Sequence, residues 1–354
     1  MKAPKRSAPR KRKESRQEQP TVFVTNRVHP EVLAFLKQFA RVKSNPNIEP
    51  FSRAQFFKEA SRASALMVFM NDTLDAAALE QCPQLRIVAA ALKGCDNFDV
   101  AACTARGIWF TIVPDLLTNP TAELAITLAL GISRKVLEGD RIVRSGAYGG
   151  WRPILYGTGL YGRTAGIVGM GKLGRALASR LSALGMKILY SDPVALPGAM
   201  QTELGATRVS LAELLASSDF VFLLLPLTPE TFHLFGSATL GRMKRSSFLI
   251  NIGRGSTVDE KAIARALASG RLAGYAADVF EMEDWALPDR PNSVHRALRA
   301  QSAKTLFTPH LGSAVRETRL EIEMRAARNI VEALSGRRPP DAINDVPVRP
   351  GSPG

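Results

Sequence analysis

The stretch GIVGMGKLG, residues 166–174, constrains the fold more than any other part of the sequence. Its glycines at 169, 171 and 174 have the spacing GxGxxG. That spacing alone is weak evidence, but here an apolar strand-like run precedes it, and a helical run and the strand-like run KILYSD follow it. Glycines in this context allow a tight turn and a close backbone approach, so a pyrophosphate can lie at the helix N-terminus. The stretch therefore predicts a dinucleotide-binding strand–helix–strand unit.

The residues around this turn define the predicted cofactor site. Asp192 ends the second strand-like run, 18 residues after Gly174. Its carboxylate can accept hydrogen bonds from a ribose diol and would repel a 2′-phosphate, and residues 193–196 offer no cation to hold one. The sequence therefore favours NAD over NADP, and the alternative is a glycine-rich turn in another kind of α/β protein. The predicted cofactor-binding residues are Gly169, Met170, Gly171, Lys172, Leu173, Gly174, Asp192, Pro193, Pro226 and Asp278.

Short apolar runs alternate with helical patterns along most of the chain. Six strand-like runs, from TAGIVG to TLFTP, occupy residues 164–309, and a long helical period at 118–146 precedes them. Four earlier runs lie at 21–25, 65–69, 85–92 and 108–113. This alternation is typical of parallel sheets with helices on both faces, and six strands complete a dinucleotide-binding sheet. We therefore predict an α/β fold with two doubly wound parallel-sheet, Rossmann-like domains and a cleft between them.

Composition and charge exclude several classes of protein. No apolar run reaches the roughly 18 residues that a membrane span needs, and no signal-peptide core follows the basic start, so we expect a cytoplasmic protein without a membrane partner. The net charge of +15 suggests nucleic-acid binding at first, but residues 1–20 alone carry +6. Basic tails can bind polyanions, yet we interpret this tail as a disordered, solvated extension. Cys82, Cys95 and Cys103 form no CxxC pair and predict reduced thiols with no metal site.

Polar side chains follow the strand-like runs at the ends where ligands bind in open α/β sheets. Arg254 follows SFLINI, Glu283 follows GYAADVF and His310 follows TLFTP. Earlier in the chain, Met70 follows ALMVF and Lys93 follows LRIVAAAL. Histidine suits a general base near neutral pH, a carboxylate can fix its tautomer, and arginine can bind an oxyanion with two donors. Each residue alone has an ordinary structural explanation, but their combination predicts a catalytic site.

Four motifs occur in order along the chain: GMGKLG, NIGRGSTVDE, DVFEMED and TPHLG. Together they resemble the successive signatures of the D-isomer-specific 2-hydroxyacid dehydrogenase family, from about Val24 to Gly336. The resemblance implies NAD as cofactor, a homodimer formed by the nucleotide-binding domain, and the catalytic residues Arg254, Glu283 and His310. It also implies a discontinuous outer domain. The resulting division is a basic tail at 1–20, an outer substrate domain at 21–117 and 310–340, an NAD-binding domain with a dimerisation arm at 118–309, and an irregular tail at 341–354.

Within this family the chain resembles the phosphite dehydrogenase branch. Hydroxyacid members usually have proline after the motif glutamate, whereas this chain has Asp284-Trp285. Departures from the branch pattern include Lys172 in the glycine turn and Asp192 where glutamate is typical. The likeness implies that Trp151 and Tyr156 lie on an aromatic arm that reaches toward the site of the partner subunit. The full set of implied substrate-binding residues is Lys93, Met70, Gly94, Arg254, Arg319, Trp151 and Tyr156.

The likeness implies NAD-dependent oxidation of phosphite to phosphate. His310 would deprotonate the attacking water, Glu283 would orient His310, and hydride would pass from phosphorus to the nicotinamide ring. Two alternatives stay open. One is a 2-hydroxyacid dehydrogenase of the glycerate or glyoxylate type, in which His310 takes the hydroxyl proton and Arg254 binds the carboxylate. The other is a dinucleotide-sensing regulatory protein with the same fold.

Overall fold

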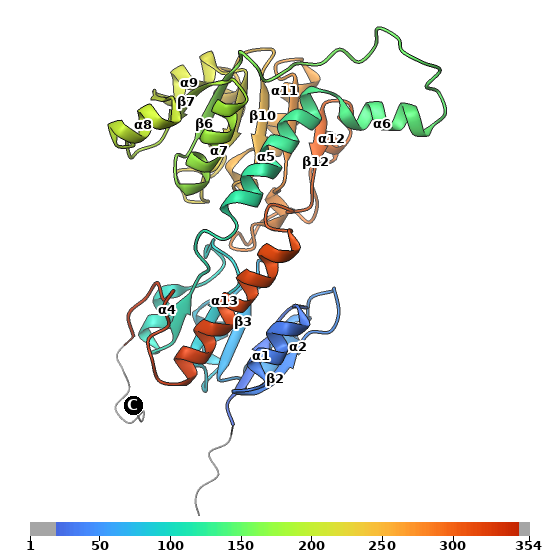
Figure 1. Ribbon diagram of the computed structural model, residues 1–354. Coiled ribbons are helices and arrows are strands. Elements are labelled where there is room, and N and C mark those ends of the chain that lie inside the picture. The colour runs from blue at the N-terminus through green and yellow to red at the C-terminus, as the bar shows by residue number, and fades with distance from the viewer. Residues whose placement is uncertain (1–18, 347–354) are drawn as a thin grey trace, which may run out of the picture.

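Two parallel β-sheets organise residues 19–346, the part of the chain that the computed structural model describes (Figure 1). The first sheet has the strand order β2-β1-β3-β4-β5. Its strands are β1 (Thr21–Val24), β2 (Arg41–Ser44), β3 (Ala65–Val68), β4 (Ile87–Ala90) and β5 (Trp109–Thr111). The sequence analysis missed β2, because this polar edge strand, RVKS, contains no apolar run.

Alternate residues of the first sheet pack into two cores, one on each face, because successive strand side chains point in opposite directions. In β1, Val22 and Val24 join one core and Phe23 joins the other. The first core is covered by α1 (Pro30–Leu36) and α13 (Arg316–Leu334), so the last helix of the chain packs on the first sheet. The second core is covered by α2 (Arg53–Ala60), α3 (Ala76–Glu80) and α4 (Val100–Ala105).

The second sheet has seven strands in the order β12-β11-β10-β9-β6-β7-β8. They are β6 (Thr164–Val168), β7 (Lys187–Ser191), β8 (Ala206–Arg208), β9 (Phe220–Leu223), β10 (Phe248–Asn251), β11 (Gly274–Ala277) and β12 (Thr305–Phe307). The sequence analysis predicted six of these seven and missed β8, whose three residues are too short to show a pattern. All neighbouring strands in both sheets run parallel.

Helices also cover both faces of the second sheet. One face carries α5 (Thr118–Ser133), α7 (Lys172–Ala183) and α8 (Gly198–Leu204). The other carries α9 (Leu211–Ser217), α10 (Ser237–Leu240), α11 (Glu260–Ala268) and α12 (Arg296–Arg299). The predicted α/β fold with two doubly wound, Rossmann-like domains is therefore confirmed.

The sequence analysis expected one long helical period at 118–146, but the structure has two helices in this range. Lys135 adopts a left-handed backbone conformation with φ of 53°, which ends α5 and starts α6 (Val136–Arg144) in a new direction. No residue of α6 is buried. In Figure 1, α6 and the loop after it stand away from the body of the seven-stranded domain.

Two connections join the domains: one leads from β5 to α5, and the other from β12 to α13. After α13 the chain returns to the first sheet, where Ala342 pairs with Thr111 and Asn344 accepts a hydrogen bond from Phe110 N at 2.8 Å. The first six residues of the segment predicted to be an irregular tail thus cover the edge strand β5. Residues 1–18 of the predicted basic tail, and residues 347–354, lie outside the described part of the chain. Within residues 19–346, no helix is long and apolar enough to cross a membrane.

Candidate active site

Three adjacent strands position the residues predicted to be catalytic. Arg254 follows β10, Glu283 ends the short 3₁₀ helix η2 (Glu281–Glu283) after β11, and His310 follows β12. Because these strands are neighbours in a parallel sheet, their carboxyl ends lie at one edge. There Nδ1 of His310 lies 2.7 Å from Oε2 of Glu283. This contact leaves Nε2 as the ring atom available for proton transfer.

A buried carboxylate braces the turn that carries His310. The backbone of His310 has a φ of 55° and its N–H donates to the carbonyl oxygen of Asp278 at 2.9 Å. The Asp278 side chain accepts hydrogen bonds from the Thr308 hydroxyl, Leu311 N and Gly312 N at 2.6, 2.7 and 2.8 Å. Burial raises the pKa of Asp278 above its usual value. Asp278 therefore holds the imidazole in place, and it also lines the cavity that contains the glycine turn.

The guanidinium of Arg254 forms an ion pair across the cleft with Asp96 of the first domain. Nε lies 3.2 and 3.3 Å from the two carboxylate oxygens, and Nη2 lies 3.1 Å from Oδ1. Burial lowers the pKa of Arg254, but the carboxylates of Asp96, Asp284 and Glu283 together raise it above its usual value. A Cβ atom on Gly94 would lie 1.7 Å from Nη2 of Arg254, so a side chain there would displace the guanidinium from this position. The sequence analysis did not predict the Asp96 partner.

The turns that carry Arg254 and Glu283 are locked together. The buried carboxylate of Asp284 accepts a hydrogen bond from Ser256 N at 2.6 Å. A Cβ atom on Gly255 would lie 1.9 Å from the carbonyl carbon of Phe280, so the two backbones touch. Asp284 thus couples the position of Arg254 to that of Glu283.

Lys93 and Arg319 have carboxylate partners too. Nζ of Lys93 lies 3.5 Å from Asp115, which also pairs with Lys172 of the glycine turn. The hydrogen bond from Lys172 lowers the pKa of Asp115. Arg319 lies 3.7 Å from the buried Glu323 and donates to the Ala91 carbonyl at 3.4 Å. The predicted cations are therefore all at the cleft, but each faces an acid that the sequence analysis did not assign to it.

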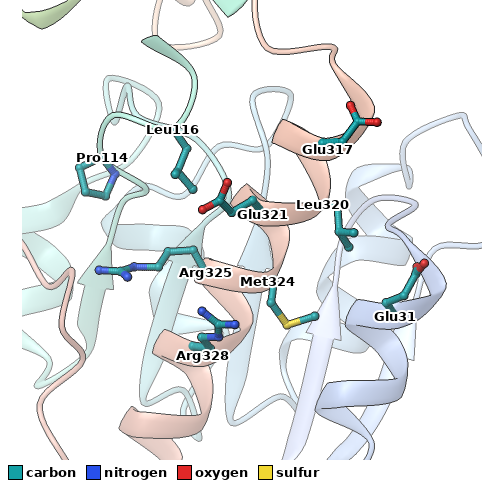
Figure 2. A pocket seen from close by; sticks show the side chains of 9 residues that line it. All are labelled: Glu31, Pro114, Leu116, Glu317, Leu320, Glu321, Met324, Arg325 and Arg328. Atoms are coloured by element: carbon teal, nitrogen blue, oxygen red, sulfur yellow. The ribbon is translucent and has the colours of Figure 1, made fainter. Parts of the chain in front are cut away.

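Two cavities meet at this site. A cavity of about 600 Å³ is lined by the glycine turn, Pro226, Asp278, Met70, Lys93, Gly94, Arg254, His310 and Arg319. A neighbouring cavity of about 470 Å³ is lined by Met70, Gly94, Arg254, Glu283, Asp284, Trp285, His310, Arg319 and Glu323, but not by Lys93. A third, of about 540 Å³, lies along the outer side of α13 between Pro114, Leu116 and Glu31 (Figure 2). It contains none of the predicted site residues.

The comparisons with known proteins agree with this geometry. Residues 126–312 match the model of the D-isomer specific 2-hydroxyacid dehydrogenase NAD-binding domain. The chain belongs to the D-isomer specific 2-hydroxyacid dehydrogenase family. It is 39% identical to the glyoxylate reductase of Korarchaeum cryptofilum over 337 residues, which cover 95% of this chain and 99% of that protein. It is also 39% identical to the glyoxylate reductase of Aeropyrum pernix, over 95% of this chain and 99% of that one.

A solved structure from Thermus thermophilus has the same fold. It superimposes with a TM-score of 0.84 at 34% identity, covering 92% of this dehydrogenase and all of that chain. Relatives at this level of identity and coverage establish the oxidoreductase family, and the two relatives named above are both glyoxylate reductases.

The dehydrogenase uses NAD, and its glycine turn fits a dinucleotide. Gly169 has a φ of 98°, and a Cβ atom on Gly174 would lie 2.4 Å from the Gly169 carbonyl oxygen. Gly171, which caps α7, has nothing near its Cβ position, so that side of the turn is open. The N-terminus of α7 and this open backbone suit a pyrophosphate. NAD bound to this turn would supply a hydride acceptor in the cavity that His310 also lines.

Two predicted substrate residues do not join the site within one chain. Trp151 and Tyr156 lie on the loop after α6, and their side chains are 81% and 76% exposed. Neither lines the cleft cavities. Asp192 and Pro193 also lie outside those cavities, at the end of β7, where Asp192 accepts a hydrogen bond from Met170 N at 2.7 Å.

The sequence analysis missed three acids of the site: Asp96, Asp115 and Glu323. Asp96 and Asp115 follow β4 and β5 within a few residues, so the strand-end rule that found Lys93 could have found them. Glu323 carries no such signal. It lies four residues after Arg319 on α13, a helical spacing that applies equally to surface pairs.

Proposed function

We propose that this dehydrogenase transfers hydride between nicotinamide and a small 2-hydroxy acid, with glyoxylate and glycolate as the substrate class. The observation that carries the proposal is the His310–Glu283 pair, 2.7 Å apart, which lines the cleft cavity of about 470 Å³ together with Arg254. Oxidation of a 2-hydroxy acid requires one base to take the hydroxyl proton and one arginine to bind the carboxylate. The relatives named glyoxylate reductase, which align over almost the whole chain, support the same class.

The residues divide the reaction between them. Arg254 binds the substrate carboxylate with its planar guanidinium, which orients the hydroxyl carbon toward the nicotinamide. In the oxidative direction Nε2 of His310 removes the hydroxyl proton while the carbon that bears the hydroxyl gives its hydride to the nicotinamide. In reduction a hydride adds to the carbonyl carbon and the imidazolium of His310 returns the proton to the carbonyl oxygen, which gives the alcohol. Glu283 positions the ring and stabilises the imidazolium that forms.

A homodimer is part of the proposal. Large apolar side chains gather on α6 and the loop that follows it, and they are exposed in the single chain. They are Val136, Leu137, Val143, Tyr148, Trp151, Ile154, Tyr156 and Tyr161. An exposed apolar segment of this size is typical of an interface. Light scattering on the pure protein should give twice the chain mass of 38.4 kDa, and a monomer at micromolar concentration would exclude the arm as a dimer contact.

Phosphite is a second candidate substrate. Three cations, Lys93, Arg254 and Arg319, line one cavity with His310, and a doubly charged oxyanion without carbon would use more than one of them. Burial lowers the pKa of Arg319, and the ion pair of this guanidinium with Glu323 is long, at 3.7 Å. In this reaction His310 would deprotonate water rather than a substrate hydroxyl, and Arg254 with Lys93 would hold the oxyanion.

One assay separates the two candidates. The pure protein is mixed with NAD and either glycolate or phosphite, and with NADH and glyoxylate, while NADH absorbance is followed. We expect glyoxylate reduction with a kcat/KM of at least about 10⁴ M⁻¹ s⁻¹, the lower range for enzymes on their own substrates. If kcat/KM for phosphite oxidation exceeds that for glycolate oxidation by more than about tenfold, the second candidate would be established instead. NAD binding without turnover of any of the three would contradict both and indicate a regulatory protein.

A further inference from the structure

The turn after β7 is held by an arginine from the neighbouring strand. Arg208 ends β8 and lies opposite Tyr190, two residues before Asp192. Its Nη2 donates to the carbonyl oxygens of Asp192 and Pro193 at 2.9 and 2.8 Å, and its Nε donates to Asp192 O at 3.2 Å. A guanidinium thus lies against the residue that marks the adenosine ribose of a bound dinucleotide.

The Asp192 carboxylate does not neutralise this arginine. Its Oδ2 accepts from Met170 N at 2.7 Å and its Oδ1 accepts from Val194 N at 2.8 Å, so both oxygens bind backbone donors. Among residues 19–346, no carboxylate forms an ion pair with Arg208, which is exposed. The ribose end of the cofactor site therefore carries an unpaired positive charge held in a fixed orientation.

We propose that Arg208 forms a binding site for the 2′-phosphate of NADP, so that the protein accepts NADP as well as NAD. The residues that follow Asp192 in the sequence offer no cation, but β8 brings one to the same turn. Nε and Nη2 of Arg208 already donate to the carbonyl oxygens of the turn, so Nη1 is the nitrogen that remains to donate a charge-assisted hydrogen bond to a phosphate oxygen. Asp192 remains in reach of a ribose 2′-hydroxyl, and its two backbone hydrogen bonds offset part of its repulsion of a phosphate.

Fragments of the two cofactors test this proposal without turnover. Adenosine 2′,5′-bisphosphate and 5′-AMP, which differ only in the 2′-phosphate, are titrated calorimetrically into the full-length protein. We expect the bisphosphate to bind within about tenfold of 5′-AMP, and more weakly as salt is added. Arg208→Ala should weaken the affinity for the bisphosphate by at least about tenfold, which is the effect of one charge-assisted hydrogen bond. The affinity for 5′-AMP should change by less than about twofold.

Two further variants separate charge recognition from support of the turn. Arg208→Lys keeps the charge but not the planar fork, so it should retain part of the preference for the bisphosphate. Arg299→Ala removes the same charge from α12, beside the opposite edge of the sheet, and should leave both affinities unchanged. Equal weakening of both fragments by Arg208→Ala would show that Arg208 only supports the turn. Bisphosphate binding that is absent where 5′-AMP saturates the wild-type protein would equally overturn the proposal.

Discussion

Replacing His310 by asparagine is expected to lower kcat by about 10²–10⁴, the usual contribution of a general acid–base residue. Asparagine retains a side-chain donor for the Glu283 carboxylate, which lies 2.7 Å from Nδ1 in the wild-type protein. It has no group that accepts and returns a proton at the Nε2 position. Steady-state kinetics in both directions measure the effect, whichever of the two candidate substrates is turned over.

The control for this variant is rescue by a small base. Adding imidazole should restore part of the activity of His310→Asn, because the space left beside the substrate opens into the cleft cavity. NAD affinity and the melting temperature should stay near the wild-type values, since Asp278 still holds the turn through Thr308 and Gly312. A kcat within about threefold of wild type would remove His310 as the base.

The positions of Arg254, Glu283 and His310 could be predicted because each follows an apolar strand, and parallel strands end at one edge. Their geometry could not. The His310 turn depends on Asp278, whose carboxylate accepts three hydrogen bonds from residues 308–312, and the sequence analysis had assigned Asp278 only to the cofactor. Support of this kind arises from side chains that meet after folding, and no spacing in the sequence encodes it.

For the same reason, the sequence analysis could not predict the acids that face the predicted cations. Whether Asp96 reaches Arg254 depends on the relative orientation of the two domains, because β4 and β10 belong to different sheets. Similarly, β2 and β8 were missed because short edge strands with exposed residues carry no apolar pattern. Missing β8 also hid Arg208 from the cofactor site. A pattern of apolar residues therefore predicts which strands form, but not which side chains the edges of the sheet bring together.

Replacing Arg254 by alanine is expected to lower kcat/KM by about 30- to 5,000-fold, because loss of one partner of the charge pair between Arg254 and the bound anion costs about 2–5 kcal/mol. Two losses contribute. The substrate anion loses its two-donor contact, and Asp96, which Arg254 contacts at 3.1 to 3.3 Å, becomes an unpaired acid beside the bound anion. Arg254→Lys should recover less than about tenfold, since an ammonium cannot reproduce the planar fork.

A double-mutant cycle with Asp96 separates these two losses. If the unpaired Asp96 repels the substrate, Asp96→Asn should restore about tenfold of kcat/KM in the Arg254→Ala background. In the wild-type background the same change should lower kcat/KM, because Asp96 orients the guanidinium through two of its nitrogens. Opposite signs in the two backgrounds can arise only if Asp96 acts through Arg254. Equal effects of Asp96→Asn in both would show that the ion pair across the cleft has no part in binding the anion.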